Sequence, residues 1–170
     1  MSESPLATVV SSRPKVVVER TYRARVQELW DLWTTKEGFE SWWGPEGFRV
    51  EVHTMDACLG GAIHYDMIAD APEAIKAMRE MGRPLSHEAH GRFTEMSPHG
   101  RLAITHMIEF LPGVKPYQST IAVDFFPSGD TVRMSITLDP MHDEEFTRMS
   151  AMGFTSQLTK LDKRFGDRNG

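Results

Sequence analysis

Hydrophobic residues change their spacing several times along the chain, and each change predicts a new element. Residues 15–22 are rich in valine and predict a strand. In residues 24–34 the positions of Val26, Leu29, Trp30 and Trp33 follow one face of a helix. A second short helix is predicted over residues 36–42, where Thr34 and Glu37 resemble a capping box at its start.

Alternating apolar and polar residues then predict six more strands, at residues 48–52, 62–67, 85–96, 101–110, 117–126 and 131–138. A helical pattern over residues 72–81 interrupts them, with Pro72 suited to its first turn and Gly82 to its end. We predict a long last helix capped by Asp139, begun by Pro140 and ended before Gly166.

The two halves of the last helix differ in their apolar pattern. Residues 154, 158, 161 and 165 share one face in the second half and predict ordinary core packing. Phe146, Met149 and Gly153 share a different face in the first half. A flexible methionine and a missing side chain suit the wall of a cavity. A kink, or a close approach by the first helix, would explain Gly153 equally well.

The hairpin turns set the register of the predicted sheet. Met96 is expected opposite Arg101, Phe125 opposite Val132, and Val52 opposite Tyr65. These pairings gather the apolar side chains on one face, as a half-buried antiparallel sheet requires. That inner face is predicted to contain residues 50, 52, 63, 65, 67, 87, 89, 91, 93, 102, 104, 106, 108, 121, 123, 125, 132, 134, 136 and 138.

Composition narrows the class of protein. With 170 residues, 40% hydrophobic and 25% charged, the chain is typical of a soluble globular protein. We expect a flexible tail at residues 1–13 and a single domain over residues 14–170. A net charge of −5 argues against nucleic acid as a partner. The single cysteine, Cys58, argues against a disulfide and favours a cytoplasmic location. The apolar runs are too short to predict membrane insertion, and the N-terminal residues lack the basic-then-apolar pattern of a signal peptide.

The element order and a series of short motifs resemble one known superfamily. The motifs are residues 25–30 (RVQELW), 42–48 (WWGPEGF), Asp56 with Gly60-Gly61, residues 95–98 (EMSP) with Arg101-Leu102, Gly153-Phe154, and Leu158 with Leu161. Together they resemble the heat-shock-chaperone ATPase activator-like branch of the START-like (SRPBCC) superfamily, which includes the birch-pollen-allergen-like proteins. The resemblance covers residues 15–165.

This resemblance implies an α+β helix-grip fold. A seven-stranded antiparallel sheet would wrap around the long C-terminal helix, with two short helices after the first strand. A cavity would lie between the sheet, the long helix and the two short helices. The helix at residues 72–81 departs from the simplest pattern of this superfamily. We expect it to act as a lid at the cavity mouth or to contribute to a homodimer contact. The superfamily includes ligand carriers, enzymes and chaperone regulators, so the fold leaves the function open.

Three polar residues, Tyr65, His87 and His106, lie on the predicted inner face. His106 is expected opposite Gly91, where the missing side chain would leave open space. Its imidazole could bind a ligand or act as a general base. A buried histidine that hydrogen-bonds a neighbour is the simpler interpretation, and Tyr65 is open to the same two interpretations.

The remaining polar motifs predict no metal or nucleophile site. His53 and His64 form an outer-face pair for which simple solvation is favoured. His87 and His90 are spaced for opposite faces of a strand and do not form a metalloprotease motif. Cys58 has no positioned base beside it, so a nucleophilic role is not expected. We expect no cofactor.

The sequence favours a binding protein for a small, largely hydrophobic molecule held between the sheet and the last helix. The predicted ligand-binding residues are Trp43, Tyr65, Met67, His87, Phe93, His106, Phe125, Met134, Phe146, Met149 and Gly153. One alternative is an enzyme of cyclase, dehydratase or hydrolase type that uses His106 and Tyr65 as acid and base. The other, implied by the resemblance, is a regulator of a chaperone ATPase.

Overall fold

A computed structural model describes residues 14–109 and 113–166 of the chain. The elements of this part run β1 (Val16–Arg23), α2 (Val26–Thr34), α3 (Lys36–Glu40), β2 (Phe48–Met55), β3 (Ala62–Ala69), α4 (Pro72–Glu80), β4 (Ser86–Ser97), β5 (Arg101–Ile108), β6 (Tyr117–Ser128), β7 (Thr131–Leu138) and α5 (Glu144–Phe165). The predicted element order is confirmed. The predicted flexible tail at residues 1–13 lies outside the described residues.

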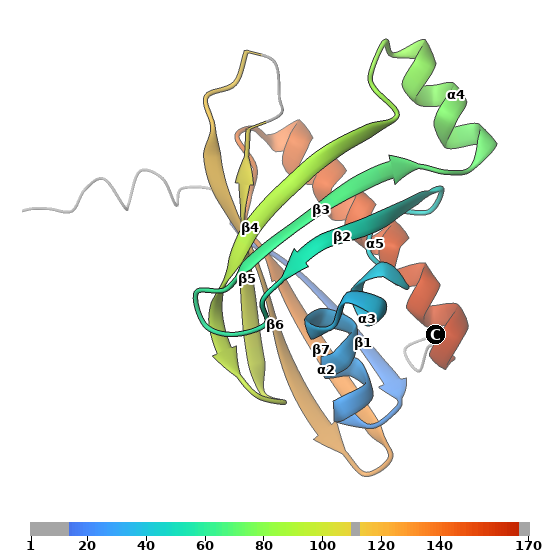
Figure 1. Ribbon diagram of the computed structural model, residues 1–170. Coiled ribbons are helices and arrows are strands. Elements are labelled where there is room, and N and C mark those ends of the chain that lie inside the picture. The colour runs from blue at the N-terminus through green and yellow to red at the C-terminus, as the bar shows by residue number, and fades with distance from the viewer. Residues whose placement is uncertain (1–13, 110–112, 167–170) are drawn as a thin grey trace, which may run out of the picture.

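All seven strands form one antiparallel sheet in the order β1-β7-β6-β5-β4-β3-β2. The first strand of the chain therefore pairs with the last, and only the β1–β7 pair joins strands that are not consecutive. Figure 1 shows α5 running along one side of this sheet, with α2 and α3 near its C-terminal end. This is the α+β helix-grip arrangement that the resemblance implies.

The registers confirm the predicted faces but correct two of the three predicted pairings. Val52 pairs with Tyr65 as expected, and Gly91 pairs with His106. Met96 pairs with Leu102 instead of Arg101, because an irregularity between Phe93 and Glu95 shifts the register of β4 and β5 by one residue.

Around the β6–β7 turn, Phe125 pairs with Met134 instead of Val132. The turn is therefore tighter than predicted, since Ser128 pairs directly with Thr131 across it. The shift is two residues and leaves each side chain on its predicted face, because successive side chains alternate with a period of two.

Helix α3 begins at Lys36 as predicted, but its predicted cap and the predicted start of the last helix are wrong. Thr35 caps α3, and its hydroxyl accepts a hydrogen bond from Gly38 N at 3.0 Å. Helix α5 begins four residues after the predicted start, because Asp143 is its cap and accepts from Phe146 N at 2.7 Å. Asp139 has another role, since its carboxylate accepts from Lys15 Nζ and Thr120 N.

The core lies between the sheet and α5, and one end of it is filled by aromatic side chains of α2, α3 and the loop after them. Trp33 packs edge-on against Trp42 and Trp43, with ring centroids 5.1 and 5.5 Å away, and these rings contact Phe154 of α5. The second half of α5 is buried at Phe154, Leu158 and Leu161, as predicted. The aromatic cluster therefore occupies one end of the sheet and leaves the other end to be closed by different residues.

Helix α4 forms as predicted but buries none of its side chains. In Figure 1 it stands away from the sheet, at the end of the molecule where α5 begins. Its proposed roles, as a lid or a homodimer contact, stay predictions.

Candidate functional site

A cavity of about 230 Å³ lies between the sheet and the first half of α5. Its wall takes residues from β3, β4, β5, β6 and β7, from the loop after α3, and from α5. The lining residues are Trp43, Pro45, Tyr65, Met67, His87, Ala89, His106, Met107, Ile108, Ser119, Ile121, Leu138, Asp139, Met141, Ser150, Gly153, Phe154 and Gln157. Most of these side chains are apolar, as in sites that bind small molecules.

Gly153 contributes to this cavity by its lack of a side chain. A Cβ atom placed on Gly153 would have no other atom within 4 Å, apart from its chain neighbours and the nearby backbone of α5. A close approach by the first helix, one of the three explanations for this glycine, is therefore excluded. Glycine in the middle of a helix costs about 1 kcal/mol relative to alanine. This destabilising glycine therefore stands at a position where an added side chain would extend into open space.

Three side chains on the cavity wall form a continuous hydrogen-bonded chain. Trp43 Nε1 donates to the hydroxyl of Tyr65 at 3.0 Å, and the same hydroxyl lies 3.0 Å from His106 Nε2. All three residues are buried. Trp43 comes from the loop after α3, Tyr65 from β3 and His106 from β5, so the fold brings together residues far apart in the sequence.

Burial keeps the Tyr65–His106 pair uncharged. The pKa of His106 falls to about 4, mainly because burial penalises the imidazolium form, with a smaller effect from His90. Burial raises the pKa of the Tyr65 hydroxyl. At neutral pH the pair is therefore a neutral imidazole and a neutral phenol. Such a pair supplies hydrogen bonds, but neither group has the near-neutral pKa that suits proton transfer.

The loop between α3 and β2 is held against α5 by a buried glutamine. Gly44 has a φ of +95°, a conformation that favours glycine, and it turns the chain directly after Trp43. Gly44 N donates to Gln157 Oε1 at 2.8 Å. Gln157 is 4% exposed and lines the cavity, and its Nε2 atom has no hydrogen-bond partner. This loop thus fixes Trp43 while one end of Gln157 stays unpaired.

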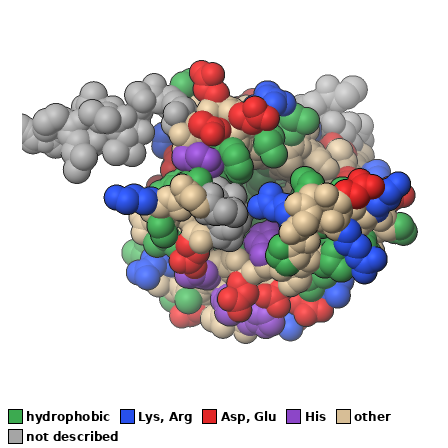
Figure 2. Space-filling model, turned by 90° about the horizontal axis from the view of Figure 1, so that it is seen from above, with side chains coloured by type: hydrophobic (Ala, Val, Ile, Leu, Met, Phe, Trp, Pro, Cys, Tyr) green, Lys and Arg blue, Asp and Glu red, His purple; other side chains and the backbone are tan. Residues whose placement is uncertain are grey.

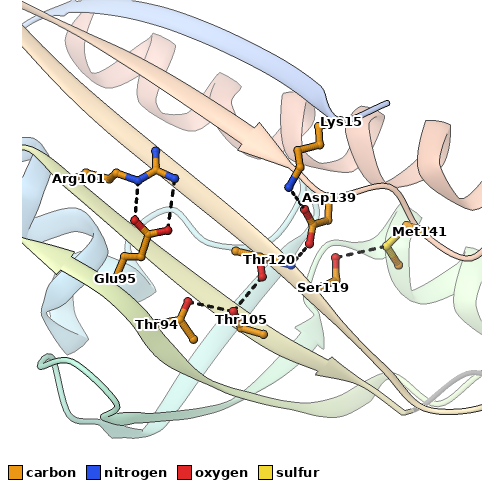
Figure 3. A network of polar contacts seen from close by, with 9 residues as sticks. All are labelled: Lys15, Thr94, Glu95, Arg101, Thr105, Ser119, Thr120, Asp139 and Met141. Atoms are coloured by element: carbon orange, nitrogen blue, oxygen red, sulfur yellow. Dashed lines mark hydrogen bonds and ion pairs between the residues drawn. The ribbon is translucent and has the colours of Figure 1, made fainter. Parts of the chain in front are cut away.

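Asp139 is the only acidic residue among the described residues that line the cavity. Figure 3 shows its carboxylate held between Lys15 Nζ, at 2.8 Å, and the backbone N–H of Thr120, at 3.0 Å. On the neighbouring residue, the Ser119 hydroxyl makes a long contact of 3.9 Å to the sulfur of Met141. The charge of Asp139 is therefore paired with Lys15, which directly precedes β1, and is not available to a ligand.

His87 also lines the cavity and is half-buried. Its pKa is lowered, first by burial and then by the nearby positive charge of Arg83. Arg83 and Asp66 are the charged groups that influence it. The cavity therefore has a neutral imidazole at His87 as well as at His106.

The structure brings six of the eleven predicted ligand-binding residues to the cavity wall: Trp43, Tyr65, Met67, His87, His106 and Gly153. The other five lie elsewhere. Phe93 and Met134 are fully buried in the core, and Phe125 packs against Trp30 at 5.7 Å between ring centroids. Phe125 and its partner Met134 therefore lie at the end of the sheet that α2 fills.

Phe146 and Met149 lie at the start of α5, outside the cavity lining. The ring of Phe146 packs on His142, with 4.4 Å between ring centroids, and Met149 is 48% exposed. Helix α5 begins at Glu144 instead of Pro140, so both residues lie in its first two turns, closer to its start than predicted.

Gly91 opposes His106 as predicted, but it does not leave open space. A Cβ atom on Gly91 would lie 2.2 Å from the carbonyl oxygen of Thr105 and 2.9 Å from His106 Cα. The glycine is needed because the neighbouring backbone of β5 comes too close for any side chain.

Sequence reasoning did not identify Gln157, Ser119, Asp139 or Met141 as cavity residues. Gln157 had a visible signal, because it lies between Phe154 and Leu161 on the buried face of the last helix. A polar residue inside an apolar stripe needs a partner or a role. Met141 lies between β7 and α5 and had no such signal.

Other candidate chemistry finds no support in the described residues. No group of three or more histidine, cysteine or acidic side chains there is placed to hold a metal ion. His53 and His64 are neighbours, 5.1 Å between ring centroids, and each faces a carboxylate. Cys58 is exposed, and a hydrogen bond to Asp56 raises the pKa of its thiol, which disfavours the thiolate.

Acidic and basic side chains are not separated on the face at the end of the molecule where α4 lies (Figure 2). Figure 2, which views the molecule from the end where α4 and the start of α5 lie, shows acidic, basic, histidine and hydrophobic side chains mixed over this face. Within the described residues, no helix has the length and apolar character needed to cross a membrane.

Comparison with known proteins places the chain in a family. The family model described as "Activator of Hsp90 ATPase homolog 1-like protein" matches residues 23–166, which is most of the chain. No curated protein matches the sequence.

Solved structures of several bacterial proteins share the fold. A crystal structure from Chromobacterium violaceum has a TM-score of 0.71 at 20% identity, covering 89% of this chain and 96% of that chain. A solution structure from Arthrobacter aurescens has a TM-score of 0.68 at 20% identity, covering 87% and 83%. The AHSA1 protein from Silicibacter pomeroyi has a TM-score of 0.68 at 19% identity, covering 89% and 96%. The chain therefore belongs to the Activator of Hsp90 ATPase homolog 1-like family, within the START-like (SRPBCC) superfamily.

Proposed function

We propose that this protein binds a small, largely apolar molecule in the cavity between the sheet and α5. The observation that carries the proposal is Gly153, which stands in the middle of a helix although no neighbouring atom prevents a side chain there. An alanine would favour the helix by about 1 kcal/mol. Open space beside a residue of this kind is what a binding site needs and what a close-packed core avoids.

The chemistry of the wall supports binding over turnover. The cavity contains the hydrogen-bonded Trp43, Tyr65 and His106, all uncharged at neutral pH. A general acid or base works best with a pKa near the working pH, and burial moves both Tyr65 and His106 away from it. A few polar groups in an apolar wall can still orient a ligand.

The proposal is tested by mass spectrometry of the gently purified protein under native conditions, together with thermal shifts across a library of small apolar and aromatic compounds. We expect a co-purifying molecule or a set of stabilising compounds, because a ligand that binds only the folded state stabilises it. A variant with Gly153→Leu, which places a side chain in the cavity, should lose the response. Thr155→Leu, on the exposed face of the same helix, is the matched control.

Loss of the response in the control alone, or an equal response in the wild type and Gly153→Leu, would show that ligands bind elsewhere. Absence of any co-purifying molecule and of any thermal shift would contradict the proposal.

The family name favours a second candidate, the regulation of a chaperone ATPase. A pull-down from the cell of origin against its own ninety-kilodalton chaperone tests it, with the chaperone's ATPase rate as the readout. Retention with a changed rate would support regulation, and no retention would contradict it. The enzyme alternative rests on the Tyr65–His106 contact and predicts turnover of a compound found in the binding screen.

A further inference from the structure

Two polar groups of the cavity wall, Gln157 and the Trp43–Tyr65–His106 chain, have more hydrogen-bond donors than partners. Gln157 is the clearest case, because its Oε1 accepts from Gly44 N while its Nε2 has no partner. Buried polar groups in folded proteins are nearly always hydrogen-bonded, and each exception needs an explanation. Here the unpaired amide belongs to a residue of the cavity wall.

The Trp43–Tyr65–His106 chain adds a second unused donor. It contains three donor hydrogens, on the indole, the phenol and the neutral imidazole, and only two hydrogen bonds join the three residues. If the phenol donates to His106 Nε2, the hydrogen on Nδ1 is left over. If Nε2 donates to the phenol, the phenolic hydrogen is left over. One donor stays unused in either tautomer.

The described residues of the cavity wall also provide no unpaired charged group that could bind a charged ligand. Among the described residues that line it there is no lysine or arginine, and the carboxylate of Asp139 is paired with Lys15. His87 and His106 both have lowered pKa values and are neutral at pH 7. Burying a carboxylate or an ammonium group without a partner is very unfavourable, so such an environment excludes ions.

The size of the cavity limits the ligand further. A cavity of roughly 150 Å³ is known to hold benzene, so about 230 Å³ has room for one ring with a short substituent. The indole of Trp43 and the ring of Phe154 are part of the wall. An aromatic or similarly compact apolar body fits these surfaces.

Resting on the binding function proposed above, we propose that the ligand is an uncharged molecule with a compact apolar body and a carbonyl oxygen that accepts a hydrogen bond from Gln157 Nε2. A carbonyl oxygen has two lone pairs and no hydrogen, so it matches the unpaired amide of Gln157 and the unused donor of the Trp43–Tyr65–His106 chain. The hydroxyls of Ser119 and Ser150 both donate and accept, so they favour neither a donor nor an acceptor on the ligand. Free carboxylic acids and amines, charged at neutral pH, are excluded as ligands.

The test compares three compounds of similar size by isothermal titration calorimetry on the wild-type protein: acetophenone, ethylbenzene and benzoate. A neutral hydrogen bond changes an equilibrium constant by roughly three- to tenfold, so acetophenone should bind that much tighter than ethylbenzene. Benzoate should not bind measurably. Equal affinities for acetophenone and ethylbenzene, or a preference for benzoate, would overturn the inference.

Two variants identify the donor. Gln157→Met keeps the length of the side chain and removes the amide, so the acetophenone preference should fall to about one while ethylbenzene still binds. Gln157→Glu keeps an acceptor for Gly44 N if loss of that bond prevents folding, and it should disfavour acetophenone relative to ethylbenzene. An unchanged preference in the folded variants would overturn the role of Gln157.

These outcomes separate the inference from the proposed function. If ethylbenzene binds the wild type and the carbonyl brings no advantage, for example because a water molecule already satisfies Gln157, the binding function stands and the inference is wrong. If none of the compounds binds and the screen of the proposed function is also negative, the binding function itself is contradicted.

Discussion

At the scale of single residues, the two glycines at positions 91 and 153 have opposite reasons for being there. Gly91 is required because backbone atoms of β5 occupy the place of a Cβ, whereas Gly153 faces open space. The sequence marked both positions as unusual. It could not assign the reasons, because they depend on how close a second strand or helix approaches.

The contrast predicts opposite changes in stability. Gly91→Ala should lower the free energy of unfolding by about 2 kcal/mol or more, since a Cβ 2.2 Å from Thr105 O forces the strands apart. Urea denaturation measures the change. An alanine at this position that is as stable as the wild type would show that β4 and β5 are not held this closely.

His106 predicts a pH dependence of stability. Its pKa is about 4 in the folded protein and about 6.5 in the unfolded chain, so between these values the unfolded state binds the proton more readily. The contribution of neutral His106 to the free energy of unfolding is fully present above pH 6.5. It is lost as the pH falls toward 4, by up to about 3 kcal/mol.

Denaturation of the wild type and of His106→Gln between pH 4 and 7 measures this dependence. Glutamine cannot titrate and can still accept a hydrogen bond from Tyr65, so the variant should lose less stability on acidification. His87 and the carboxylates titrate in both proteins and cancel in the difference. Parallel pH curves would contradict the buried, neutral state of His106.

At the scale of elements, α5 combines two functions along its length. Its second half is a core helix through Phe154, Leu158 and Leu161, and its first half closes the cavity through Ser150 and Gly153. The change of apolar face seen in the sequence was the signal for this division. The start of the helix was misplaced because Asp139-Pro140 and Asp143 are both good start signals, and the pairing of Asp139 with Lys15 and Thr120 decides between them.

Gly153→Ala should therefore stabilise the protein by about 1 kcal/mol, which corresponds to a rise in Tm of about 2–4 °C for a chain of this size. A thermal melt followed by circular dichroism measures it. A lower Tm would mean that the position is packed against another element, and the cavity wall would have to be placed elsewhere.

Helix α4 should be the least protected helix longer than one turn. It buries none of its side chains, so its opening exposes little new apolar surface. Hydrogen exchange should show its backbone amides exchanging well before those of residues 154–161 in α5. Equal protection would indicate that α4 is covered in solution, as the predicted homodimer contact requires.

At the scale of the whole molecule, the element order and the faces of the strands could be predicted from the sequence, because both depend on local periodicity. The registers were less accurate, since the β4–β5 irregularity and the tight β6–β7 turn have no clear local signal. The cavity was the hardest part. Tyr65 and His106 are predicted from their face of the sheet, but Phe93, Phe125 and Met134 share that face and lie in the core.

The cavity residues differ from the core residues in how distant elements pack against them. The tryptophans of α2 and the α3–β2 loop fill one end of the sheet and leave the other end open. Periodicity shows which side of the sheet is inside, and only the packed structure shows where the inside is not filled.

Methionine methyl groups give the most direct test of that open end. In protein labelled with ¹³C at the methionine methyls, titration with acetophenone should shift the signals of Met67 and Met141, which line the cavity, and leave those of the exposed Met81 and Met152 unchanged. Shifts confined to Met81 and Met152, or no shift up to the solubility of the compound, would contradict a ligand cavity between the sheet and α5.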